Sequence, residues 1–323
     1  MRAAVYTERG PAAEVLRVVD VPDPVPGPGE VRVRLRASGV NPTDWKSRQG
    51  GGAPPAGWQI PNQDGAGEVD AVGEGVDPGR VGQRVWVHLA AAGRPNGTAA
   101  TYTCVPAEAA RPLPDGVSYG EGAGLGIPFV TAHRCLFADG PISGRRVLVT
   151  GGAGAVGHAA VQLARLAGAR VLTTVSSSDK AAVAATAGPH AIVNYRAPDF
   201  LERLQAAAGD GVDRVVDVAL GANLEASLAV LRPHGVIVSY ASENPDPVLP
   251  TRRLMTGNVT IRYVLVYGLT PAMLDAAVVA IGDALAAGEL RGLPERHFAL
   301  EDIAQAHDAV EAGAVGKVIV DIP

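Results

Sequence analysis

Glycines near the middle of the 323-residue chain have the spacing of a phosphate-binding turn. Gly152, Gly154 and Gly157 form the pattern G-x-G-x-x-G directly after the apolar run 147–149. The first glycine of such a pattern permits a tight turn, the second lets a pyrophosphate touch the backbone, and the third allows close helix–strand contact. The N-terminus of the following helix offers unpaired N–H groups to an anion. The residues assigned to this turn are Gly151, Gly152, Gly154, Ala155, Val156 and Gly157.

This turn lies after an expected strand and before an expected helix, so it predicts a dinucleotide-binding site. The alternative is a tight strand-to-helix turn in another kind of α/β domain. An NAD site usually has an acid about 20 residues further on, which binds the ribose 2′-hydroxyl. Here Ser176 follows the second strand, 171–175, and no acid comes before Asp179. Small hydroxyls followed by Lys180 suit a 2′-phosphate better, so NADP(H) is favoured, although Lys180 can also be a solvated lysine at a helix start.

Composition predicts a two-domain globular protein. Hydrophobic residues make up 47% and charged residues 19% of the chain, and the formal net charge is −5. That charge, with no basic run, argues against a nucleic-acid partner. Cys104 and Cys135 form no framework, which indicates a reducing compartment, and no apolar run is long enough to cross a bilayer. We therefore expect a cytoplasmic protein without a membrane partner.

The first 110 residues predict a β-barrel-like domain, because short strands alternate with turns rich in glycine and proline. Residues 31–38 alternate apolar and charged side chains, as a half-buried strand does. Residues 39–57 have no regular pattern and are expected to be irregular. The expected strands of this part are 3–6, 15–19, 31–38, 65–72 and 83–89.

From residue 118 the pattern becomes helical and then alternates strand with helix, which predicts a parallel sheet covered on both faces. A last strand of this series is expected at 259–266, a helix at 273–287 and a closing strand at 317–322. The expected fold is thus α/β: a barrel-like catalytic domain, 1–124 with 266–323, and a doubly wound Rossmann domain, 125–265, that binds NADP(H).

The chain resembles the zinc-independent quinone oxidoreductases, the zeta-crystallin-like branch of the medium-chain dehydrogenases/reductases, whose first domain is GroES-like. The resemblance covers essentially the whole length in the same order. Zinc-dependent relatives carry a cysteine where this chain has Asn41 and a histidine where it has Gln63. The histidines are scattered and two cysteines cannot complete a tetrahedral site, so no metal is expected. The matching segments are 39–44 (GVNPTD), 64–69 (DGAGEV), 81–85 (VGQRV), 126–132 (GIPFVTA), the glycine turn, 193–196 (VNYR) and Gly316-Lys317.

The resemblance implies roles for further residues. Lys180 and Tyr195 match positions that hold the 2′-phosphate, and Thr131 matches one that faces the nicotinamide half. The alternatives are a strand-end tyrosine packed on the sheet and an ordinary helix threonine. The other positions assigned to the cofactor by this resemblance are Ser239, Tyr240, Ser242, Val264, Val266 and Lys317.

The resemblance also implies hydride transfer to a quinone or a related conjugated carbonyl. Negative charge on the acceptor oxygen would be stabilised by the Asn41 amide, the Thr131 hydroxyl and the Lys46 ammonium group. Asp44 belongs to the same loop, and Asn41 can instead form an Asx turn before Pro42. No general acid is evident, and protonation by water is adequate for a hydroquinone or an enolate.

One departure weakens the quinone assignment. The related enzymes usually have a tyrosine two residues after the loop acid, where this chain has Lys46. An enoyl or enone reductase and a non-catalytic NADPH-binding protein therefore remain alternatives. By resemblance we also expect a homodimer, with 259–269 as a candidate edge, although burial within one chain explains that apolar stretch equally well.

Overall fold

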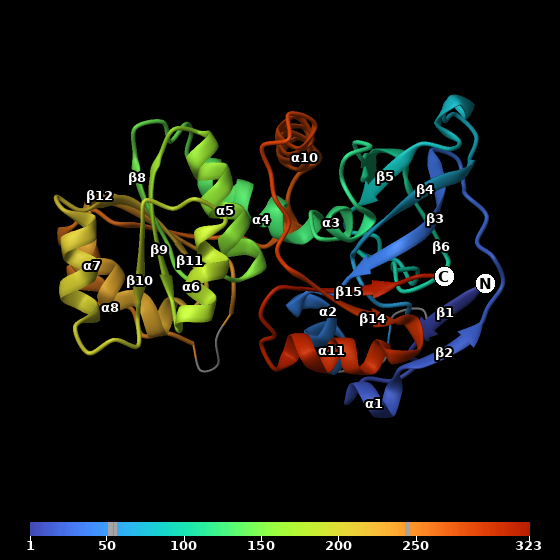
Figure 1. The fold of residues 1–323 in the computed structure, drawn as a ribbon, viewed down its shortest axis with the longest axis horizontal. Coiled ribbons are helices and arrows are strands. Elements are labelled where there is room, and N and C mark those ends of the chain that lie inside the picture. The colour runs from blue at the N-terminus through green and yellow to red at the C-terminus, as the bar shows by residue number, and fades with distance from the viewer. Residues whose placement is uncertain (51–53, 55–56, 243–245) are drawn as a thin grey trace. The chain divides into compact units, whose positions relative to one another are not determined.

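The computed structural model of the chain describes residues 1–50, 54, 57–242 and 246–323 (Figure 1). Contacts divide these residues into two compact units. The first unit comprises Met1–Ile127, Val278–Gly288 and Gly292–Pro323, and the second comprises Pro128–Ala277 and Glu289–Arg291. The chain returns to the first unit within helix α10 (Pro271–Ala286).

A mixed sheet organises the first unit. Its strand order is β14-β15-β3-β4-β5-β7, and β6 also pairs with β3. In register, Gly39 of β3 pairs with both Asp64 of β4 and Ile319 of β15. Three distant segments of the sequence therefore meet at one end of β3. The strands are β3 (Glu30–Gly39), β4 (Asp64–Val72), β5 (Arg84–Val87), β6 (Tyr102–Pro106), β7 (Ala110–Pro112), β14 (Glu295–Ala299) and β15 (Lys317–Asp321).

The start of the chain differs from the expectation only at one boundary. The expected strand 15–19 is present as β2 (Arg17–Asp20), and its first expected residue instead ends a short helix, α1 (Ala12–Val15). Strand β2 pairs antiparallel with β1 (Arg2–Val5) in a separate small sheet. Ala12 and Val15 are buried in the apolar core of this unit, and burial of these two side chains favours the helical turn over an extended strand.

The expectation of irregular chain at 39–57 is wrong for its central part, which is helix α2 (Pro42–Gln49). Pro42 occupies the first helical turn, where its missing N–H is not needed. The Asp44 carboxylate accepts from the N–H of Asn41 at 2.7 Å and thereby caps the helix start. The sequence Asn41-Pro-Thr-Asp44 carried this capping signal, but no apolar periodicity followed it.

The other helices of the first unit are short. α3 (Tyr119–Ala123) begins with a capping box, in which Ser118 Oγ accepts from the N–H of Glu121 and Glu121 accepts from that of Ser118. α11 (Ile303–Glu311) packs against α2 and β15. This unit also has the single 3₁₀ turns η1 (Pro78–Arg80), η2 (Ala107–Ala109) and η4 (Leu300–Asp302), and the turn η3 (Val266–Gly268) lies in the second unit.

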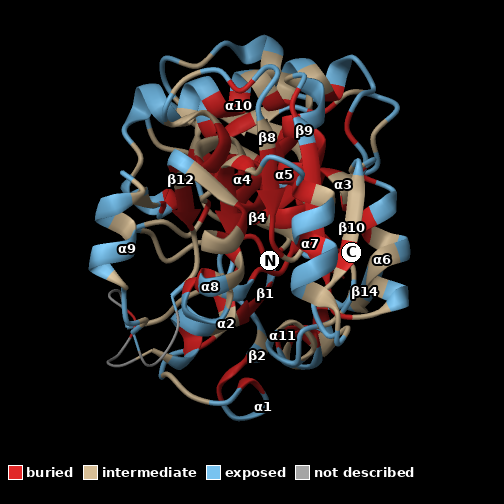
Figure 2. Ribbon diagram, turned by 90° about the vertical axis from the view of Figure 1, so that its left-hand side faces the viewer, coloured by how far each residue is buried: buried red, intermediate tan, exposed pale blue. Residues whose placement is uncertain are grey.

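The second unit contains a wholly parallel sheet with strand order β10-β9-β8-β11-β12-β13. Helices α5 and α6 cover one face of this sheet, and α7 and α8 cover the other (Figure 1). Strands β8 and β9 are buried after their first residues, and β12 is mostly buried from Gly235 to Ser239 (Figure 2). The strands are β8 (Arg146–Val149), β9 (Arg170–Val175), β10 (Ala191–Asn194), β11 (Val212–Asp217), β12 (Leu231–Ser239) and β13 (Thr260–Tyr263). The helices are α4 (Gly126–Phe137), α5 (Ala155–Leu166), α6 (Ser178–Ala185), α7 (Phe200–Ala208), α8 (Leu220–Val230) and α9 (Thr251–Thr256).

Taken in chain order, this sheet has the order 3-2-1-4-5-6, which defines a doubly wound Rossmann fold. Ligands of such sheets bind beyond the carboxyl ends of the strands where the order reverses, here between β8 and β11. One expected boundary is wrong: the last strand ends at Tyr263 rather than at residue 266, and a 3₁₀ turn follows at Val266–Gly268.

Candidate functional site

The glycine turn follows β8 as predicted, and two of its glycines are required by packing. A Cβ atom on Gly152 would lie 2.0 Å from Thr173 Oγ1, and one on Gly157 would lie 2.3 Å from the carbonyl oxygen of Gly151. Gly151 itself has a φ of +70°, which favours glycine. These contacts bring α5 close against β8 and β9.

Gly154 differs from its neighbours because nothing fills the space beside it. A Cβ atom there would meet only the carbonyl oxygen of Gly151, at the ordinary contact distance of 3.4 Å. Gly154 is the N-cap of α5, and its carbonyl accepts the first helical bond, from the N–H of His158 at 2.8 Å. The N–H groups of residues 155–157 thus precede the hydrogen-bond ladder of the helix. An open backbone beside a helix N-terminus fits a pyrophosphate.

The residues predicted for the 2′-phosphate lie at the carboxyl ends of neighbouring strands. The N–H of Tyr195 donates to the carbonyl of Val175 at 2.9 Å, which places Tyr195 beside the end of β9, where Ser176 follows. Ser177 caps α6 by accepting from the N–H of Lys180, so Lys180 lies in the first turn of that helix. Ser176 is buried, whereas the Tyr195 side chain is 44% exposed and does not pack into the sheet.

The remaining predicted cofactor residues of the second unit follow the next strands. Ser239 is buried at the end of β12 and its carbonyl accepts from the N–H of Val264 at 2.9 Å. Burial raises the pKa of Tyr240 well above its usual value. Val264 and Val266 are both buried. Ser242 is exposed.

Sequence reasoning missed Thr150 and Asp217, which lie at the reversal of strand order. The Thr150 hydroxyl lies 3.2 Å from Asp217 Oδ2 and accepts from the N–H of Val218 at 3.0 Å. Both side chains are buried. Each residue ends a buried apolar strand, and that position was the only signal in the sequence. Their bonds join the ends of β8 and β11, the two strands that flank the expected ligand position.

In the first unit, Asn41, Asp64 and Lys317 form a buried polar cluster together with Asp44. Asn41 Nδ2 donates to Asp64 Oδ2 at 2.7 Å, and Lys317 Nζ donates to Asn41 Oδ1 at 2.7 Å. Lys317 Nζ also donates to the carbonyl of Val40 at 3.1 Å. The exposed fractions of Asn41, Asp64 and Lys317 are 1%, 0% and 5%. The register of β3 with β4 and β15 explains why these distant residues meet.

Burial controls the protonation of this cluster. It raises the pKa of Asp64 to about 6, against the stabilising charge of Lys317 and the hydrogen bonds from Asn41 and Ile127. Burial also raises the pKa of Asp44, and the nearby Asp64 charge adds to that effect. Burial lowers the pKa of Lys317. Two carboxyl groups therefore share one ammonium group in a site that disfavours charge.

The other two residues predicted to be catalytic lie in different settings. Lys46 is exposed on α2, with its Nζ 5.7 Å from the centre of the Trp45 ring. Thr131 is buried within α4 of the second unit. The structure therefore brings Asn41 and Asp44 together in the polar cluster and leaves Lys46 outside it.

A second hydrogen-bonded chain was not predicted. His307 Nε2 pairs with Asn62 Oδ1 at 3.0 Å, and Asn62 Nδ2 donates to Ser38 Oγ at 2.9 Å. Ser38 Oγ pairs with Thr98 Oγ1, which donates to the backbone carbonyl of Asp64 at 2.6 Å. The chain crosses from α11 to β4 and fixes the backbone of Asp64. No local motif marks it, because its members come from four separate segments.

Among the described residues, no group of three or more histidine, cysteine, aspartate or glutamate side chains could hold a metal ion. The Gln63 side chain, at the position where zinc-dependent relatives have a ligand, accepts from the N–H of Ala91 at 3.1 Å. A metal-free site remains a prediction. No described helix is long and apolar enough to span a membrane.

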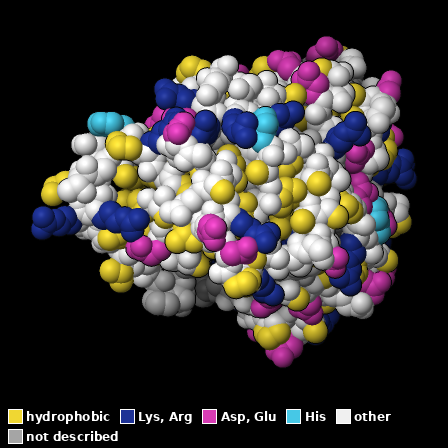
Figure 3. Space-filling view, turned by 60° about the vertical axis from the view of Figure 1, so that its left-hand side comes forward, with side chains coloured by type: hydrophobic (Ala, Val, Ile, Leu, Met, Phe, Trp, Pro, Cys, Tyr) yellow, Lys and Arg dark blue, Asp and Glu magenta, His cyan; other side chains and the backbone are white. Residues whose placement is uncertain are grey.

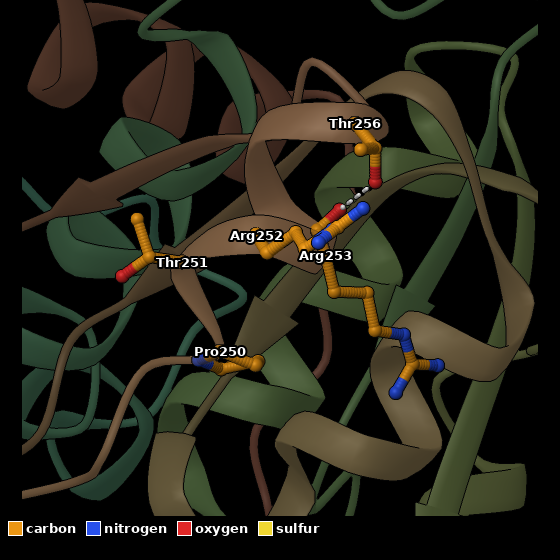
Figure 4. Close-up of a pocket in the computed structure, with 5 residues that line it drawn as sticks. All are labelled: Pro250, Thr251, Arg252, Arg253 and Thr256. Atoms are coloured by element: carbon orange, nitrogen blue, oxygen red, sulfur yellow. Dashed lines mark hydrogen bonds between the residues drawn. The ribbon is translucent and has the colours of Figure 1, made fainter.

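A surface pocket of about 560 Å³ lies at α9, and none of the predicted site residues lines it. Figure 4 shows its lining, with Thr256 donating to the carbonyl of Arg253. Arg253 also pairs with Glu225 of α8 at 2.6 Å. On the face drawn in Figure 3, acidic and basic side chains are interspersed and form no basic field. The pocket is lined by Pro250, Thr251, Arg252, Arg253 and Thr256.

Family models match both parts of the chain. The model of the alcohol dehydrogenase GroES-like domain matches residues 27–115, and that of the zinc-binding dehydrogenases matches residues 155–281. The fold and these matches define a medium-chain dehydrogenase/reductase. The quinone oxidoreductase of Lama guanicoe is 31% identical over 326 residues, with 99% of this chain and 97% of the relative covered. The chain therefore belongs to the quinone oxidoreductase family, the zeta-crystallin-like branch of the superfamily.

Other relatives differ in their described activity. A 2-haloacrylate reductase from Burkholderia sp. is 33% identical over 322 residues and covers 95% of this chain and 94% of its own length. The solved Escherichia coli quinone oxidoreductase in complex with NADPH has a TM-score of 0.86 and 26% identity, covering all of both chains. A solved NAD-dependent alcohol dehydrogenase has a TM-score of 0.88 and 30% identity, also over all of both chains. The family is thus shown, while the acceptor varies among its relatives.

Proposed function

We propose that this chain is an NADPH-dependent reductase that transfers a hydride to a quinone or a related conjugated carbonyl compound without a metal ion. The observation that carries the proposal is the open backbone at Gly154, which is the N-cap of α5. A relative complexed with NADPH supports the choice of cofactor.

Backbone and side-chain groups of the second unit would hold the cofactor. The N–H groups of residues 155–157 would bind the pyrophosphate, and Lys180 and Tyr195 would bind the 2′-phosphate. No carboxylate follows β9 before Asp179, which is exposed, so a 2′-phosphate would meet no nearby repulsive charge at Ser176. This arrangement favours NADPH over NADH.

The bound reduced nicotinamide supplies the hydride. The protein must then stabilise negative charge on the acceptor oxygen, which hydrogen-bond donors in a dry site do well. Asn41 Nδ2 has a second hydrogen besides the one given to Asp64, and it is the donor we assign first. We assign Thr131 and Lys46 as further donors to this oxygen, after Asn41. Water would supply the proton that completes the reduction.

A second candidate is an enoyl or enone reductase. The observation that favours it is Lys46, an exposed cation beside Trp45 where the quinone reductases usually have a tyrosine. A lysine would suit an acceptor that carries a negative group better than a neutral quinone. The 2-haloacrylate reductase from Burkholderia is a relative whose described substrate is such an acid.

The two candidates are separated by an acceptor comparison. Purified protein is given NADPH with a simple quinone, a neutral enone and an α,β-unsaturated acid, and NADPH oxidation is followed by absorbance. Preference for the quinone supports the first proposal. Preference for the acid in the wild type, together with loss of that preference in Lys46→Tyr, supports the enoyl or enone reductase. Tight NADPH binding without turnover of any acceptor would instead indicate a non-catalytic NADPH-binding protein.

The chain would also form a homodimer through β13. This strand is at the edge of the described six-stranded sheet, so one side of its backbone is free for pairing. Tyr263 and Leu265 are 65% and 66% exposed beside that edge. Sedimentation equilibrium should give twice the chain mass, and Leu265→Asp should give the mass of one chain. A monomeric wild-type protein would contradict the dimer.

A further inference from the structure

We infer that Lys317 is a positioning residue that fixes the orientation of the Asn41 side-chain amide. The inference deepens the proposed function, because Asn41 is the first donor assigned to the acceptor oxygen. It also gives Lys317 a role other than cofactor contact, which the resemblance implied for it.

The donor and acceptor chemistry of the two partners sets the orientation. An ammonium group can only donate and a carboxylate can only accept, so Lys317 must face the amide oxygen and Asp64 the amide nitrogen. Both hydrogen bonds are 2.7 Å long and charge-assisted. A flipped amide would set its N–H₂ group against the ammonium and its oxygen against the carboxylate. Lys317 and Asp64 therefore exclude the flipped state together.

The position of the two partners is fixed by the sheet. Asp64 begins β4 and also accepts from the backbone N–H of Ile127 at 2.9 Å. Lys317 begins β15, and its Nζ is held as well by the carbonyl of Val40. Neither side chain can leave its place for solvent, because both are buried. The one amide hydrogen that remains on Asn41 then points in a single direction.

The consequence is a donor that cannot become an acceptor. An asparagine free to flip would present an oxygen to the acceptor oxygen of the substrate for part of the time, and that contact is repulsive. A fixed amide presents N–H at all times. Preorganised donors of this kind stabilise developing charge without rearrangement. Loss of Lys317 should therefore lower kcat while leaving cofactor binding intact.

The test is a double-mutant cycle with Lys317→Met and Asn41→Leu. Lys317→Met alone should lower kcat by about tenfold or more, the value of one charge-assisted hydrogen bond, with the NADPH dissociation constant within about twofold. If Lys317 acts through Asn41, the double variant should have the kcat of Asn41→Leu. Lys317→Arg, which keeps a donor, should recover most of the activity. The inference would be overturned if the two substitutions lowered kcat additively, or if Lys317→Met weakened NADPH binding without lowering kcat.

A second measurement does not depend on turnover. Hydrogen exchange of the Asn41 side-chain protons, assigned by their absence in Asn41→Leu, should be slow in the wild type and in Lys317→Arg. It should be at least about tenfold faster in Lys317→Met, or in Lys317→Leu if the methionine variant does not fold, because neither side chain carries a donor. Equal exchange rates would overturn the inference. A wild type without turnover would contradict only the proposed function.

Discussion

The glycine turn of the second unit and the polar cluster of the first unit solve the same problem, the placement of a polar group for a ligand, in opposite ways. At the turn, Gly152 and Gly157 permit contacts that any side chain would block, and the group offered is backbone N–H. In the cluster, Asp64 and Lys317 hold the Asn41 side chain through charge-assisted bonds. The turn depends on the absence of side chains and the cluster on a balance of buried charges.

This difference predicts different responses to substitution. The turn is made of residues close in sequence, so damage there should stay local to the second unit. The cluster joins β3, β4 and β15, so loss of one member leaves buried charges without partners. The cluster should therefore be sensitive to pH and the turn to side-chain volume.

The largest effect on stability is expected from Asp64→Leu. This change removes one of the two carboxyl groups that share the buried Lys317 ammonium group, together with the hydrogen bond from Asn41, and breaking a buried charge network costs about 3–5 kcal/mol. Chemical denaturation of the first unit, followed by its tryptophan fluorescence, should show that loss. A free energy of unfolding within about 0.5 kcal/mol of the wild-type value would contradict this prediction, because it would show that Asp64 contributes no more than a carboxylate in an exposed ion pair.

Matched substitutions at Gly157 and Gly154 separate packing from binding. Gly157→Val places a side chain on the Gly151 carbonyl and should destabilise the second unit by about 1–3 kcal/mol. Gly154→Val finds open space, so the fold should survive while nucleotide binding is lost. Thermal unfolding and NADPH titration measure the two properties. An unchanged NADPH dissociation constant in Gly154→Val would refute the phosphate-turn assignment.

Lys180→Ala tests the cofactor choice. Removal of one charge-assisted hydrogen bond to the 2′-phosphate should weaken NADPH binding by about 10- to 100-fold. NADH lacks that phosphate and should bind almost as before. Fluorescence titration with both nucleotides gives the ratio, and Lys46→Ala is a control from the other unit. An equal loss for NADPH and NADH would remove Lys180 from the 2′-phosphate.

The smallest effect concerns pH. Burial raises the pKa of Asp64 to about 6, above the usual value of about 3.9, so the folded chain holds this proton more tightly than the unfolded chain. The stability that this proton contributes is complete below about pH 4 and is lost as the pH rises through about 6. Asp64→Asn should reduce this loss of unfolding free energy with rising pH. For one proton the loss is at most about 1.4 kcal/mol per pH unit. An identical pH profile in the variant would contradict the protonation assigned to Asp64.

The contrast between the two regions also explains what sequence could predict. Gly152, Gly154, Gly157 and Lys180 lie within one strand–turn–helix–strand unit, so their spacing alone predicted their arrangement. The polar cluster was only half predicted. Asn41 and Asp44 were assigned by resemblance, but nothing local indicated that Asp64 and Lys317 lie against Asn41, because strand register brings them together.

The helix at Pro42–Gln49 was missed for a related reason. Its interior reads Thr43-Asp44-Trp45-Lys46-Ser47, which has no apolar stripe, and helix prediction depends on such a stripe. Its start is fixed instead by Pro42 and by the Asp44 carboxylate. Arg48 is fully buried although it is charged, which reverses the usual assumption for a helix face.

The most direct test of the central claim is acceptor-dependent oxidation of NADPH by the purified wild-type protein, with NADH as the control and a chelator present throughout. We predict steady oxidation of NADPH that requires a quinone or a conjugated carbonyl, a slower rate with NADH, and no effect of the chelator. Absence of acceptor-dependent oxidation with either nucleotide would contradict the reductase assignment. Loss of the rate on chelation would contradict hydride transfer without a metal.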